Sequence, residues 1–136
     1  MESTRSSSIL RSVAAVLVGA LAGIVLSVGT DLILHAAGLL PGPGTPPSDA
    51  MLAWATAYRT VYGIFGAWLT ARLAPSRPWR HVAVLAGLGL LANIAGLVTT
   101  WNKAAEFGPH WYPIALTVLA LPTSFCGGWL ALRGNR

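Results

Sequence analysis

Charged residues are scarce in this chain, and acidic residues are the scarcest. The 136 residues include four Asp or Glu and nine Lys or Arg, and charged residues make up 10% of the total. Soluble domains carry about 25% charged residues. So short a chain therefore has too little charge to cover a water-facing surface. Its hydrophobic fraction of 54% and its mean hydropathy of +0.63 indicate that the chain is surrounded by a lipid bilayer, which is therefore its first expected partner.

Cysteine and the common catalytic motifs are also nearly absent. Cys126 stands alone, so no internal disulfide can form. The sequence contains no GxSxG, P-loop, HExxH or CxxC motif. A haem held by His35 and His110 lacks any attachment motif. Zinc needs three or four ligands, which Asp31, His35, Glu106 and His110 could supply only as a weak alternative. We therefore expect no cofactor, no metal site and no assignable catalytic residue.

Long apolar runs dominate what is present. They cover roughly residues 9–40, 50–73, 81–101 and 111–132. Segments rich in Pro, Gly or polar residues separate them, as expected for loops, because Pro breaks helices and Gly loosens them. The sequence thus predicts one all-α domain over residues 1–136. Its architecture would be a polytopic bundle of four transmembrane helices.

Basic residues would gather on one side of the membrane if the chain crosses it four times. They are Arg5, Arg11, Arg72, Arg77, Arg80, Arg133 and Arg136. The opposite side would hold Asp49, Lys103 and Glu106. The positive-inside rule then predicts a multi-pass protein of the bacterial inner membrane with both termini in the cytoplasm. Binding to anionic lipid is the weaker interpretation of these Arg residues, and no nucleic-acid partner is expected.

The first apolar run has a second interpretation, as a cleaved signal peptide. Its apolar stretch is longer than the 7–15 residues usual for the hydrophobic region of such peptides. No cleavage site with small residues at the required positions follows it. We therefore expect this run to remain as the first transmembrane helix.

One acid and one base interrupt the first two runs. At 1.5 Å per residue, Asp31 lies about 30 Å above Arg11, near the outer boundary. Arg59 lies about 20 Å above Arg72, well inside the hydrocarbon core of the membrane. Helical side chains lean toward the helix N-terminus, so in antiparallel helices these two lean toward each other. An unpaired Arg in a bilayer costs at least about 2.5 kcal/mol. We therefore expect Asp31 to be the counter-ion of Arg59, with His35 one turn farther along the same face.

Further polar and aromatic residues are expected near this pair. They are Tyr62, Asn93, Trp101, Lys103, Glu106, His110 and Trp111. Asn93 lies close to the level of Arg59, and five of the others lie in the second outer loop. We expect a cup open to the outside, with Arg59 and Asn93 at its floor and this loop at its rim. The alternative is that the intramembrane residues only hold the helices together and that the loop aromatics form an interfacial belt.

A resemblance to a known group is carried by four stretches, GTDLILH, AYRTVYGIFGAWLTARLAP, TWNKAAEFGPHWYP and ALPTSFCGGWLALR. They resemble an uncharacterised family of small four-helix bacterial inner-membrane proteins, over nearly the whole chain after residue 10. The resemblance implies a protein that crosses the membrane four times, and it implies no activity. The four-helix multidrug exporters differ, because they carry a membrane-embedded Glu in the first helix, whereas this chain has Asp31 near the outer end. No fluoride-channel pattern is present.

Two main classes of function remain. The first is binding or transport of a small molecule, lipid head group or ion in the outward cup, with Arg59 meeting an anion. The protein would then be a homo-oligomer or have a membrane-protein partner. The second is an accessory or structural subunit that docks on a larger membrane partner. A small membrane-embedded enzyme is a third and weaker hypothesis, with Asp31 and His35 as its acid–base pair.

Overall fold

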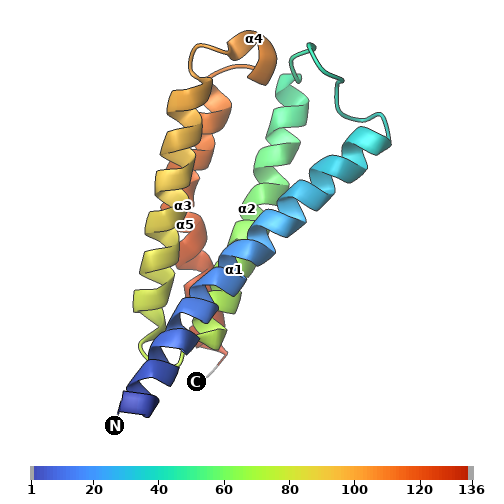
Figure 1. Ribbon diagram of the computed structural model, residues 1–136. Helices are drawn as coiled ribbons and strands as arrows, with labels where there is room; N and C mark the ends of the chain where they lie inside the picture. Colours follow the sequence, from blue (N-terminus) through green and yellow to red (C-terminus); the bar gives the residue numbers. More distant parts are fainter. Residues whose placement is uncertain (1, 135–136) are drawn as a thin grey trace.

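The computed structural model describes residues 2–134, and within them every regular element is a helix. The helices are α1 (Glu2–Ala36), α2 (Asp49–Leu73), α3 (Pro78–Thr100), α4 (Ala104–Phe107) and α5 (Trp111–Arg133). Figure 1 shows the four long helices as a bundle in which α1 is tilted across the others. We call the end where α1 begins and α5 ends the proximal end, and the end with α4 and the loop 37–48 the distal end. The predicted all-α class is confirmed.

Three helices, α1, α3 and α5, are long and apolar enough to cross a membrane. Their large side chains point outward: Ile33, Val98 and Val118 are 70%, 68% and 66% exposed. The positions with the lowest exposure hold small residues instead, namely Ala15, Ala67, Thr70 and Ala131. In a water-soluble protein, large aliphatic side chains are the ones most often buried. An apolar exterior around a core of small residues indicates insertion into a membrane.

α2 differs from the other long helices, because it is of similar length but is not among the three apolar candidates. Arg59, two Tyr, two Trp and three Thr lower its hydropathy. It nevertheless contacts α1, α3 and α5, and it has more buried residues than any other helix of the bundle. Gly66, Ala67, Thr70 and Ala71 are buried in its proximal half. The least apolar helix therefore lies where other helices shield it.

Glycine sets the closest approach between α1 and α2. A Cβ built on Gly66 would lie 2.6 Å from the carbonyl oxygen of Gly19. One turn away, the buried Thr70 hydroxyl donates a hydrogen bond of 3.1 Å to the carbonyl oxygen of Ala15. Toward the distal end α1 leans away from α2 (Figure 1). At Gly23, accordingly, the nearest atom to an added Cβ is the carbonyl oxygen of Tyr62, 3.6 Å away.

Two more glycines fix α5 against its neighbours. An added Cβ on Gly127 would lie 2.7 Å from the Cβ of Ala67 on α2. An added Cβ on Gly128 would lie 2.9 Å from the Trp79 ring and 3.2 Å from the Val82 side chain on α3. Close backbone approach of this kind is how membrane helices gain packing contacts, since lipid offers no hydrophobic driving force between them.

Helix boundaries differ from the expected ones in three places. α1 covers Glu2–Ala36 rather than 9–40; it ends early because Gly38 adopts a positive φ of 72°, with Pro41 soon after. α3 begins at Pro78 rather than at 81, because Pro fits the first turn of a helix. The loop expected between the last two long helices contains the short helix α4.

Candidate functional site

Asp31 on α1 binds two residues of α2 at once. Its Oδ1 accepts a hydrogen bond from the Tyr58 hydroxyl, and its Oδ2 forms an ion pair with Nη2 of Arg59. The expected pairing of Asp31 with Arg59 is therefore present, between side chains that are 26% and 33% exposed. Tyr58 is not among the residues expected from the sequence. Its place one turn before Tyr62, on the same face of α2, is the signal that would have found it.

Tyr62 makes a second bridge between the same helices. Its hydroxyl lies 2.8 Å from Oγ1 of Thr30, another residue that the sequence analysis did not single out. Thr30 donates its own proton to the carbonyl oxygen of Leu26, so Tyr62 is the donor in this bridge. The rings of Tyr58 and Tyr62 lie 5.8 Å apart. Long polar side chains thus connect α1 and α2 in the distal half, where the backbones diverge.

Arg59 has more donors than Asp31 can accept. A guanidinium carries five N–H groups, and only Nη2 is paired with the carboxylate. The Nε atom of Arg59 is buried and has no hydrogen-bond partner among the described residues. Leaving a buried donor without an acceptor costs about 1–3 kcal/mol, and more when the group is charged. Because only Nη2 is paired and the side chain is 33% exposed, the guanidinium can still receive an additional acceptor oxygen.

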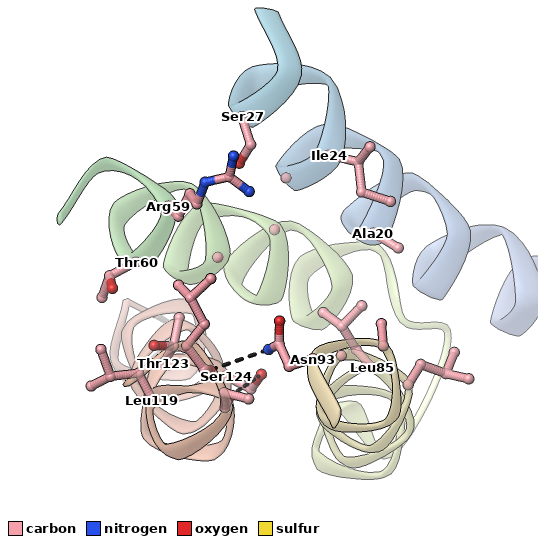
Figure 2. A pocket seen from close by; sticks show the side chains of 18 of the residues that line it. Ala20, Ile24, Ser27, Arg59, Thr60, Leu85, Asn93, Leu119, Thr123 and Ser124 are labelled. Carbon is pink, nitrogen blue, oxygen red and sulfur yellow. Dashed lines mark hydrogen bonds between the residues drawn. The ribbon is translucent and has the colours of Figure 1, made fainter. Parts of the chain in front are cut away.

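A cavity of about 490 Å³ lies beside Arg59, between α1, α2, α3 and α5 (Figure 2). Its volume falls in the range of about 300–1,000 Å³ that is usual for small-molecule sites. Arg59, Thr60, Gly63 and Gly66 of α2 line it, so Arg59 stands at its distal end. The remaining lining residues are mostly apolar or small and come from α1 (19–28), α3 (85–93) and α5 (116–124).

The exposed residues of this lining show where the cavity opens. They are Ile24 and Val28 on α1 and Leu88 and Ala92 on α3. The lining residues of α2 and α5 are buried or half-buried, with Gly66 and Ser124 the deepest among them. The cavity is therefore a groove whose mouth lies between α1 and α3 and whose back wall is α2 and α5. Below, we call it the α1–α3 groove.

A second, smaller cavity of about 180 Å³ lies toward the distal end, and it is lined by Gly96, Thr100, Phe107, His110 and Tyr112 among others. Ala92, Asn93 and Leu116 line both cavities. Asn93 and Leu116 are tied together, since Nδ2 of Asn93 donates a hydrogen bond of 3.2 Å to the carbonyl oxygen of Leu116 (Figure 2). The expected single cup is thus two cavities. Arg59 lines only the larger one, as its distal limit rather than as the floor of an outward cup.

Three of the outer-loop residues expected at the rim make contacts outside the groove. Nε2 of His110 lies 2.6 Å from the carbonyl oxygen of Trp101, and the two rings stack at 4.1 Å. Nε1 of Trp111 donates a hydrogen bond of 2.8 Å to Oδ1 of Asp49, which ties the start of α5 to the start of α2. Of the expected loop residues only His110 lines a cavity, and it is the smaller one.

Three other expected residues lie apart from the groove. His35 is exposed, and its Nδ1 donates to the backbone oxygen of Asp31, 2.9 Å away, rather than to the carboxylate. Lys103 and Glu106 are exposed and line neither cavity. Across residues 2–134, no three His, Cys, Asp or Glu side chains gather closely enough to hold a metal ion. The zinc alternative therefore has no geometric support.

Comparison of the chain with protein-family models, with curated proteins and with solved structures gives no match. Function is accordingly inferred from the residues and from their arrangement in this chain.

Proposed function

We propose that this protein is a small ligand-binding or transport protein of the bacterial inner membrane. It crosses the membrane four times, and its ligand site is the α1–α3 groove with Arg59 at the distal end. The observation that carries the proposal is a groove of about 490 Å³ beside an arginine whose Nε–H has no acceptor among the described residues. Intramembrane ionisable residues are expensive, and they commonly mark a pathway or a binding site.

Connectivity supports four crossings. α1 and α3 are both candidate spans, and both begin at the proximal end (Figure 1). The chain must therefore return to that end between Ala36 and Pro78, and α2 is the long helix in this interval. At 1.5 Å per residue, its 25 residues extend about 37 Å, more than the hydrocarbon thickness of about 30 Å. The Arg-rich proximal ends favour a cytoplasmic location for both termini.

The topology can be checked with reporter fusions. A reporter active only in the periplasm should give no signal when it is fused after residue 136, and a strong signal when it is placed within residues 45–49. An alkaline-phosphatase-type assay on intact cells is the measurement, and a reporter active only in the cytoplasm at the same sites is the control. The reverse pattern would overturn the assignment of both termini to the cytoplasm.

Ligand binding in the groove can be tested by filling it. Gly89 lines the groove and Gly87 lines neither cavity, while an added Cβ at either position meets no atom within 4 Å. Gly89→Leu should therefore occupy the groove without disturbing the helices, and Gly87→Leu is its matched control on the same helix.

Native mass spectrometry of the three proteins in mild detergent is the measurement. Wild type and Gly87→Leu should retain a bound molecule of defined mass, which Gly89→Leu should lose. Equal occupancy in all three, or no adduct in any, would contradict binding in the groove and would favour the accessory-subunit alternative.

The accessory-subunit alternative expects a sealed and fully paired Arg59. Here Arg59 keeps 33% of its side-chain surface exposed and lines an open groove, which favours binding.

A further inference from the structure

We propose that the α1–α3 groove binds one anionic amphiphile of the outer leaflet, with its single acyl chain in the groove and its phosphate on Arg59. This inference rests on the proposed function, and it names the class of ligand and its route of access. The ligand would come from the bilayer rather than from the periplasmic water. It would reach the groove sideways, between α1 and α3.

The mouth of the groove supports lateral access. Ile24, Val28, Leu88 and Ala92 are its exposed lining residues, and all four are apolar. They lie within α1 and α3, the two candidate membrane spans that border the mouth. A water-soluble ion would have to cross this apolar, lipid-facing rim. An acyl chain would instead pass from the lipid to an equally apolar protein surface. The distal side is partitioned as well, because Asn93 and Leu116 stand between the groove and the smaller cavity.

The groove also has the length and polarity of one leaflet. Its lining on α1 runs from Gly19 to Val28, about 14 Å at 1.5 Å per residue. Half of a hydrocarbon core of about 30 Å is about 15 Å. Charge is confined to the distal end, where the side chains of Arg59 and Ser27 point toward one another (Figure 2). In the proposed topology this end faces outward, so a lipid of the outer leaflet matches the groove in direction and in length.

The charge expected of the head group follows from the bonds that Asp31 and Arg59 already make. Asp31 does not line the groove, and its carboxylate already binds Tyr58 and Arg59, so it is not placed to receive a cationic head group there. Arg59 offers the opposite, because its charged side chain lines the groove, is 33% exposed and is paired with Asp31 through Nη2 alone. A planar guanidinium binds phosphate with two parallel hydrogen bonds, which favours a phosphate over a neutral hydroxyl.

A helix from a second copy of the chain would fill the mouth less well. The backbone carbonyls of a transmembrane helix are already bonded within the helix. Such a helix would cover the apolar rim but would bring no backbone acceptor to Arg59. The unpaired donor thus argues for a lipid phosphate over a protein helix as the occupant.

The test is equilibrium binding to the full chain in phosphatidylcholine nanodiscs with two labelled probes. Lysophosphatidic acid and monoacylglycerol with the same acyl chain differ only in the phosphate. Wild type should prefer lysophosphatidic acid by about tenfold or more, the ratio that corresponds to about 1.4 kcal/mol. Gly89→Leu should abolish binding of both probes, and Gly87→Leu should leave both unchanged. Excess inorganic phosphate should not compete.

Arg59 variants separate charge from folding. The ratio of the two probes, measured on one sample, is insensitive to how much of the protein is folded. Arg59→Gln should bring this ratio close to one, and Arg59→Lys should retain part of the preference. Equal affinity of wild type for the two probes, or competition by inorganic phosphate, would overturn the assignment.

The same data distinguish this inference from the proposed function. A Gly89-dependent adduct in native mass spectrometry without any preference for lysophosphatidic acid would overturn the ligand class alone. If Gly89→Leu changes neither the adduct nor the binding of the probes, the ligand class and the ligand-binding function both fail.

Discussion

Asp31→Asn is expected to destabilise the protein by about 3 kcal/mol, and by more than Arg59→Gln does. Removing one member of a buried pair costs about 3–5 kcal/mol, and we take the low end because both side chains are half-buried. In Asp31→Asn the guanidinium stays charged, since arginine does not lose its proton in proteins. In Arg59→Gln, Asp31 can take up a proton and still accept a hydrogen bond from Tyr58.

A double-mutant cycle checks this expectation. The melting temperature in detergent is measured for wild type, for the two single variants and for Asp31→Asn with Arg59→Gln. The double variant should lose less stability than the sum of the single losses, because neither member is left charged and alone. Simple additivity would mean that the two side chains do not interact. Thr99→Ala, an exposed substitution on another helix, controls for the general effect of mutation.

Gly19→Ala should lower stability by about 2 kcal/mol or more relative to Gly29→Ala. The new methyl group on Gly19 would overlap the Thr70 hydroxyl and lie 2.5 Å from the carbonyl oxygen of Gly66. Overpacking costs about 1–3 kcal/mol, and displacing Thr70 also removes its bond to Ala15, worth about 1 kcal/mol. At Gly29 an added Cβ meets no atom within 4 Å. Replacing Gly29 should therefore gain up to about 1 kcal/mol of helix propensity.

Both glycine variants lie on α1 and change the same atoms, so their difference isolates the contact with α2. The measurement is again the melting temperature in detergent, with far-UV circular dichroism to confirm equal helix content. Equal stability of the two variants would show that α1 does not approach α2 at Gly19 in the folded protein. The bridge from Tyr62 to Thr30 would then have to hold the two helices together without the glycine contact.

The sequence was sufficient for the helical class and for the pairing of Asp31 with Arg59. Composition and apolar runs decide the class, because so few charged residues exclude a water-facing surface. The pair follows from depth along two antiparallel helices and from the direction in which helical side chains lean. The first argument needs only composition, and the second needs only distances along each helix, which sequence spacing gives directly.

Tyr58, Thr30 and the true shape of the cavity needed the structure. Tyr58 reaches Asp31, and Thr30 reaches Tyr62, only because of the angle at which α1 crosses α2. That angle depends on the contact between Gly19 and Gly66. The division of the expected cup into two cavities also needed the structure, for a similar reason. Levels along the helices placed Arg59 and Asn93 at similar depth, but the rotation of each helix puts Asn93 against Leu116, between two cavities.

The enclosed position of α2 has a consequence for how the chain enters the membrane during synthesis. In the proposed topology α2 leaves the ribosome after α1, and it carries Arg59, which costs about 2.5–3.5 kcal/mol at the centre of an inserting helix. Asp31 is by then already in the bilayer and can receive it. Because the acid precedes the base in the chain, α1 would act as a built-in insertion partner for α2. If Asp31 and Arg59 were exchanged, the arginine would enter the lipid in α1, before its partner. Insertion by the translocon, rather than folding, would then be the step that fails.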